Sequence, residues 1–185
     1  MIWDSYPWKR YLYKIANYLE KQSKQKKWRK ESDFILEKNI FQSAYIIRKL
    51  FDTFKLTYNL RNYSIPIIKY PNIKHADQMN WHNIYKFYNF ENGTNENLNI
   101  QDFCNIAIHS FVFMATVNQS ALEGILINSD KIKNNFVYSI QIHEIINIIR
   151  IISVDEKMDC RITRDKNGDW VEDDPDNPRK KQQNK

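Results

Sequence analysis

The stretch 98–115 limits the possible folds most, because its apolar residues recur at helical spacing more regularly than elsewhere in the chain. The residues on this face are Ile100, Phe103, Cys104, Ala107, Ile108, Phe111, Met114 and Ala115. Asn99 is suited to cap the start of the helix. Further apolar residues flank its opposite side, and a helix that is apolar nearly all round is usually buried. We therefore expect a central, buried helix over 98–115.

A polar stripe lies opposite the main apolar face of this predicted helix. Asp102, Asn105 and His109 are three and four residues apart, so their side chains share one side of a helix. Polar groups inside a protein need hydrogen-bond partners, and these three would need them on a buried helix. The sequence leaves open whether the partners belong to another element, to water or to a ligand.

The segment 104–109, Cys-Asn-Ile-Ala-Ile-His, resembles the HEPN ribonuclease motif. In that motif an Arg, often followed by Asn or Asp, precedes a His by several residues on a helix. The resemblance implies a metal-independent ribonuclease in which His109 is the acid/base, Asn105 and Asp102 orient it, and two such helices face each other in a dimer. Cys104 stands where the family has its Arg, the residue that would stabilise charge on a phosphate.

Several short runs and the cysteine content bear on the origin and compartment of the protein. Four runs are similar to segments of bacterial proteins without an assigned function, which implies no activity: 3–8, 47–50, 80–82 and 108–113. Cys104 and Cys160 are far apart in sequence, which argues against a disulfide scaffold and favours a reducing compartment. We find no apolar run long enough to span a bilayer and no secretory leader, so we expect a cytoplasmic protein.

A cluster of basic residues lies near the end of the expected first helix. The net charge of +6 and the pI near 9.1 suit an acidic partner such as nucleic acid. The candidate nucleic-acid-binding residues are Lys24, Lys26, Lys27, Trp28, Arg29 and Lys30. The lysines and Arg29 would contact phosphates and Trp28 would stack on a base. The alternative is a solvated helix end with Trp28 packed on the next helix.

The remaining helical patterns predict an α+β fold: a helical hairpin plus a central buried helix and a C-terminal helix, packed with short antiparallel β-hairpins. The first helix begins near Pro7, with Trp8 and Tyr11 among the residues on its inner face, and the second begins at Ser32 as N-cap. Two helices joined by a short polar link usually pack antiparallel. Over 142–152, isoleucines at helical spacing predict the C-terminal helix.

Alternating apolar residues predict the strands. We expect one hairpin from 56–60 and 63–70, with Pro66 confining the second strand to a sheet edge. Two further strands are expected at 123–127 and 136–140, and Asn167-Gly168 predicts a hairpin turn. Residues 71–80 and 89–97 are expected to be loops and 81–88 a short helix. The chain is then a single globular domain over 1–172 with a disordered polar tail at 173–185.

The chemistry that the sequence lacks narrows the functional hypotheses. With three glycines it has no phosphate-binding loop, no nucleophile elbow and no dinucleotide fingerprint, and no histidine has partners at metal-ligand spacing, so we expect no cofactor or metal. His143 and Glu144 are adjacent and diverge on a helix. Three hypotheses remain. The first is a non-catalytic interaction protein, or accessory subunit of a bacterial assembly, with a protein partner or a second copy; the others are nucleic-acid binding and a HEPN-like ribonuclease.

Overall fold

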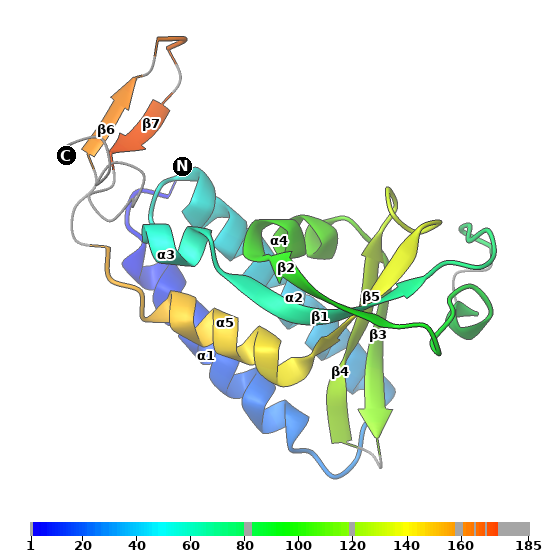
Figure 1. The fold of residues 1–185 in the computed structure, drawn as a ribbon. Coiled ribbons are helices and arrows are strands. Elements are labelled where there is room, and N and C mark those ends of the chain that lie inside the picture. The colour runs from blue at the N-terminus through cyan, green and yellow to red at the C-terminus, as the bar shows by residue number, and fades with distance from the viewer. Residues whose placement is uncertain are drawn as a thin grey trace.

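The computed structural model describes residues 2–79, 83–118, 121–157, 161–164, 166–168 and 170–173, and its fold is α+β (Figure 1). Its elements in chain order are α1 (Tyr6–Ser23), α2 (Lys30–Asp52), α3 (Tyr58–Arg61), β1 (Ser64–Pro71), the 3-10 helix η1 (Ile84–Lys86), β2 (Thr94–Asn99), α4 (Ile100–Ile108), β3 (Ser110–Asn118), β4 (Ala121–Ser129), β5 (Phe136–Gln141), α5 (Ile142–Ser153), β6 (Arg161–Arg164) and β7 (Trp170–Asp173). The first five strands form one antiparallel sheet in the order β2-β1-β5-β4-β3.

The sheet is buried on both faces near its centre. Side chains alternate along β4, so Ile125 and Ile127 join the core beneath the helices while Leu126 joins a second cluster on the opposite face. That second cluster includes Ile84 and Phe87, from the segment between β1 and β2. Burial on both sides explains why this part of the sequence is a continuous apolar run. The two strands predicted at 123–127 and 136–140 are confirmed and extend as β4 and β5.

Helices α1, α2, α4 and α5 pack over the face of the sheet from which Ile125 and Ile127 project. The predicted helical hairpin is α1 with α2; α1 also packs along α5, and α2 packs along α4 (Figure 1). Leu12 and Leu19 of α1 and Ile145 and Ile149 of α5 are buried, as their helical spacing predicts. The C-terminal helix is confirmed by α5. The prediction of a hairpin at Asn167-Gly168 is confirmed by β6 and β7, and Gly168 has the positive φ, 85°, that glycine adopts readily.

The predicted helix over 98–115 is wrong at its C-terminal half. Helix α4 covers the first part, and Asn99 caps it by accepting a hydrogen bond from the backbone N–H of Gln101 at 2.7 Å. After His109 the chain enters β3, which pairs with β4. The run from Phe111 onward fits both a helical and a two-residue period, because short apolar runs do not separate the two. Backbone pairing with β4 makes this segment the strand β3 rather than a continuation of α4. Its aromatic and β-branched residues also suit a sheet.

Two expectations for the central part of the chain are also wrong. Residues 56–60 do not pair with 63–70, because α3 occupies part of the first segment and β1 pairs with β2 and β5 instead. Strand β2 lies largely within the predicted loop 89–97. Pro66 lies opposite Asn97 of β2, whereas pairing with β5 begins at Ile68. The expectation of an edge strand is therefore also wrong, since β1 lies between β2 and β5. Pro66 is accommodated because it lies in a stretch of β1 ahead of its second partner, which suits a residue without an N–H.

The link between α1 and α2 also differs from the prediction. Helix α1 ends at Ser23, so the basic cluster lies in a connecting loop and in the first residue of α2 rather than along the first helix. Arg29, not Ser32, is the N-cap of α2; the Ser32 hydroxyl accepts a hydrogen bond from the backbone N–H of Arg29 at 3.3 Å. The first two residues of the helix predicted at 81–88, Cys160 and the tail beyond residue 173 lie outside the described residues.

Candidate binding site

The polar stripe of α4 is exposed, which corrects the expectation that it is buried. Asp102, Asn105 and His109 all face solvent, because α4 buries its opposite side, including Cys104, against the core. Complete burial raises the pKa of the Cys104 thiol, so this residue stays protonated and is not poised as a nucleophile. The three polar residues lie together, as their spacing predicts, but their side chains are exposed to solvent.

The structure adds to this stripe a residue that sequence spacing did not reveal. The guanidinium of Arg48, on α2, donates a hydrogen bond from Nη1 to Oδ1 of Asn105 at 3.1 Å. Its Nε lies 3.2 Å from Oδ1 of Asp52, one turn further along α2. Arg48 and Asn105 are far apart in sequence, so no local pattern predicts their contact. The guanidinium of Arg48 therefore lies beside Asn105, although Cys104 occupies the position at which the HEPN motif has its Arg.

The predicted nucleic-acid-binding residues are brought together at one end of the helical hairpin. The side chains of Lys24, Lys26, Lys27, Arg29 and Lys30 are all exposed. Lys24 Nζ lies 2.9 Å from Oε1 of Glu20, and Arg150 Nη2 lies 2.6 Å from the other oxygen of the same carboxylate. These hydrogen bonds, that from Arg150 first, lower the pKa of Glu20 to about 2. The other cations of the cluster extend into solvent.

Trp28 differs from the cations around it. Its ring is half-buried and packs against the core, and it lines a small hollow together with Phe113. Its indole Nε1 donates a hydrogen bond to Oδ1 of Asp33 in α2 at 2.7 Å. This geometry matches the alternative interpretation, in which Trp28 packs on the next helix, and leaves little ring surface for a base.

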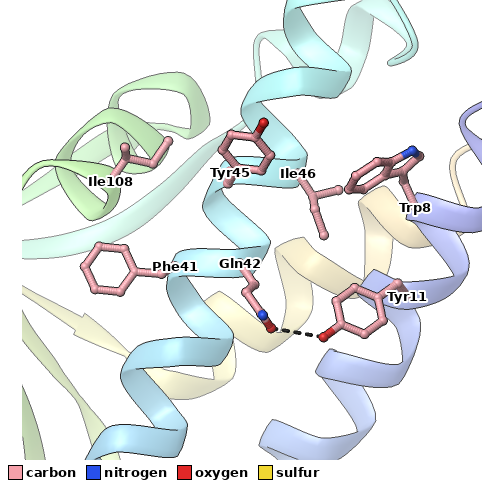
Figure 2. A pocket seen from close by; sticks show the side chains of 7 residues that line it. All are labelled: Trp8, Tyr11, Phe41, Gln42, Tyr45, Ile46 and Ile108. Atoms are coloured by element: carbon pink, nitrogen blue, oxygen red, sulfur yellow. Dashed lines mark hydrogen bonds between the residues drawn. The ribbon is translucent and has the colours of Figure 1, made fainter. Parts of the chain in front are cut away.

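A pocket lined by aromatic residues opens between α1, α2 and the end of α4 (Figure 2). We call it the aromatic pocket, and it is lined by Trp8, Tyr11, Phe41, Gln42, Tyr45, Ile46 and Ile108. Its volume is about 470 Å³, which is in the range of binding sites for small molecules or large side chains. Gln42 is its one non-aromatic polar side chain among the described lining residues, and its Oε1 accepts a hydrogen bond from the Tyr11 hydroxyl at 3.0 Å.

Helical spacing on two antiparallel helices produces this pocket. Trp8 and Tyr11 are one turn apart on α1, and Gln42 and Ile46 are one turn apart on α2, so these two pairs face each other between the helices (Figure 2). Phe41 points to the other side of α2, where Ile108 lies (Figure 2). Trp8 is 40% exposed and Tyr45 is 51% exposed, whereas Ile46 between them is 3% exposed. The pocket thus has an aromatic rim and an aliphatic floor.

The expectation that Trp8 and Tyr11 point into the core was wrong. The inner face of α1 is completed by smaller residues such as Leu12 and Ala16, which pack closely under the helix. The two aromatic rings then fall at the edge of this face. One signal was present in the sequence: α1 has more large apolar residues than a single inward stripe accommodates.

The rim of the pocket is basic. Residues 6–52, which contain α1 and α2, have twelve Lys and Arg and five Asp and Glu, a net charge of +7, and five of these cations are in the cluster in and next to the loop between the helices. Lys49 Nζ lies 5.8 Å from the centre of the Tyr45 ring. Lys14 follows Tyr11 by three residues and Lys38 precedes Gln42 by four, and both are exposed. Cations therefore neighbour the pocket on both helices.

Comparisons with known proteins add no family to this description: the chain matches no family model, no curated protein and no solved structure. Within the described residues, no group of His, Cys, Asp and Glu is arranged to hold a metal ion. In the same part of the chain no helix is long and apolar enough to cross a bilayer. The aromatic pocket offers contact area for apolar side chains, with Lys cations around it.

Proposed function

We propose that this chain is a non-catalytic binding protein, an accessory subunit that holds a protein partner in the aromatic pocket. The observation that supports this most is a recessed site whose described lining is aromatic or aliphatic except for one amide, and which is open to solvent. The oxygen of that amide accepts a hydrogen bond from the Tyr11 hydroxyl. Such a surface gains most from receiving apolar side chains of another molecule.

The energetics of protein interfaces favour this use. Partly exposed Trp and Tyr side chains carry a large share of the binding energy in many complexes, because each buries much apolar area while losing little conformational freedom. Trp8 and Tyr45 stand on either side of the buried Ile46, so a partner that fills the pocket would cover both rings. Soluble monomers rarely leave contiguous apolar patches uncovered without such a role.

The test compares variants for their ability to retain a protein partner from the native host. Tyr45→Ser removes one wall of the pocket, and Tyr13→Ser is its control, because Tyr13 is a similarly exposed tyrosine of α1 outside the pocket lining. We expect wild type and Tyr13→Ser to copurify with the same protein in stoichiometric amount and Tyr45→Ser to lose it. Retention by Tyr45→Ser, at an unchanged melting temperature, would contradict the proposal.

A second function, nucleic-acid binding, is favoured by one specific observation. Five cations are exposed in and next to the loop between α1 and α2. Lys26, Lys27 and Arg29 belong to this loop, and no Asp or Glu lies between them in the sequence. Replacing these three residues by Glu should abolish retardation of nucleic acid, and wild-type retardation should weaken steeply with salt. An unchanged shift in the triple variant would remove this function from consideration.

A further inference from the structure

We infer that the aromatic pocket receives an acidic amphipathic helix of the partner. This inference rests on the proposed function and adds the chemistry of the bound segment. It draws on two independent properties of the site, the direction of the groove and the charge around it. Both follow from residues of α1 and α2.

The groove has the shape that a helix occupies. Between α1 and α2 its walls repeat once per turn on each side, with Trp8 and Tyr11 on α1 and Gln42 and Ile46 on α2 (Figure 2). A third helix laid along such a groove inserts side chains spaced three, four and seven residues apart. The Tyr11 hydroxyl pairs with Oε1 of Gln42, and the rest of the described lining is aromatic or aliphatic, so apolar anchors suit the groove.

The charge around the groove selects an acidic segment. Lys14 of α1 and Lys38 and Lys49 of α2 neighbour the rim on both sides, apart from the basic cluster in the loop between the helices. Acidic residues flanking the apolar anchors of a bound helix would meet these cations, which increases both the rate of association and the specificity. A second copy of this chain fits less well, since pairing this face with itself would bring the lysines of the two rims together.

Nucleic acid is disfavoured at this pocket by the position of the basic loop. Trp8 is in the first turn of α1, and the cluster of Lys26, Lys27 and Arg29 begins beyond its last residue. Fifteen residues of helix separate Trp8 from Ser23, which corresponds to roughly 20 Å. The main phosphate-binding candidates therefore lie away from the pocket, and the two sites are separable by mutation.

The experiment selects helical peptides on the folded protein. A displayed library has Leu or Phe at helical spacing over about four turns, and its flanking positions draw equally on Glu, Lys, Gln and Ser. We expect selection on wild type to enrich Glu, selection on Tyr45→Ser to enrich no sequence, and selection on Lys38→Glu/Lys49→Glu to favour Lys. The matched control, Lys131→Glu/Lys166→Glu, makes the same change in net charge outside the helical hairpin and should retain the preference for Glu.

The opposite outcomes overturn the inference. Enrichment of neutral or basic peptides, or no enrichment on wild type, excludes an acidic helix. Binding of a fluorescent single-stranded RNA that is lost in Tyr45→Ser would assign the pocket to nucleic acid instead. If the partner from the host still depends on Tyr45 while the library shows no acidic preference, only this inference fails. If the host partner does not depend on Tyr45, the proposed function itself fails.

Discussion

Asn128 is expected to be one of the most sensitive polar positions in the fold. Its side chain is fully buried in β4 and forms three hydrogen bonds: Oδ1 accepts from the backbone N–H of Val112 at 3.2 Å, and Nδ2 donates to the Tyr88 hydroxyl at 2.7 Å and to the Phe136 carbonyl at 3.1 Å. Strand β3 is irregular between Ser110 and Val112. The amide therefore replaces a ladder bond at a bulge and ties the segment before β2 to the sheet.

The structure allows the loss in Asn128→Ala to be worked out bond by bond. The buried N–H of Val112 and the Phe136 carbonyl lose this partner, and each unpaired buried group costs about 1–3 kcal/mol. The Tyr88 hydroxyl keeps its hydrogen bond to the Lys133 carbonyl, at 2.6 Å, so its loss is smaller. We expect a decrease of about 3 kcal/mol in the free energy of unfolding, with a melting temperature lower by about 10 °C.

Urea unfolding followed by circular dichroism measures this change. The control is Asn118→Ala, since the Asn118 side chain is exposed on β3 and bonds only to the exposed Glu123 among the contacts found for it. This control should lie within about 0.5 kcal/mol of wild type. If Asn128→Ala loses no more stability than Asn118→Ala, the buried network contributes nothing measurable and the reasoning is refuted.

Three further predictions concern other parts of the molecule. Gly124→Ala would place a Cβ 2.2 Å from the Ile140 carbonyl oxygen, so we expect a loss of more than about 2 kcal/mol by urea unfolding; an unchanged midpoint would show that β4 and β5 shift freely. Glu20, whose pKa falls from 4.5 to about 2 mainly through Arg150, stabilises the fold above pH 4.5 and loses this effect as the pH falls toward 2. The stability difference between wild type and Glu20→Gln should shrink over that range, and a difference independent of pH would argue against the pairing. His109→Ala should melt like wild type because His109 is exposed, and the HEPN resemblance further predicts that it loses RNA cleavage; equal cleavage by both proteins would reject that resemblance as a guide to activity.

Local patterns in the sequence were sufficient to predict those elements whose apolar residues fit only one periodicity, that of a helix or that of a strand. Isoleucines at helical spacing predicted helix α5, and the position of Asn99 just before an apolar helix predicted its role as N-cap of α4. The boundary between α4 and β3 did not follow, because the residues after His109 satisfy two periods and only the neighbouring strand β4 decides between them. Long-range pairing also decides the partner of β1, which no local signal specifies.

The aromatic pocket shows the same limit at the level of the candidate site. Sequence spacing identified Asp102, Asn105 and His109 as neighbours, and they are, but it misjudged their burial. It grouped Trp8 with the core because an aromatic residue at helical spacing usually points inward. The register between α1 and α2, fixed by contacts such as Tyr11 with Gln42, turns these edge positions into a pocket, and that register depends on the whole hairpin.

Photocrosslinking in the native host tests the central claim most directly. A photoreactive phenylalanine derivative replaces Tyr45, at the pocket rim, or Tyr13, outside its lining on the same helical hairpin. The proposed function predicts a crosslink to one defined protein from position 45, absent from position 13 and lost when Trp8→Ser is added. Equal crosslinking from both positions, or a product from position 45 that a nuclease removes, would contradict docking of a protein partner in the aromatic pocket.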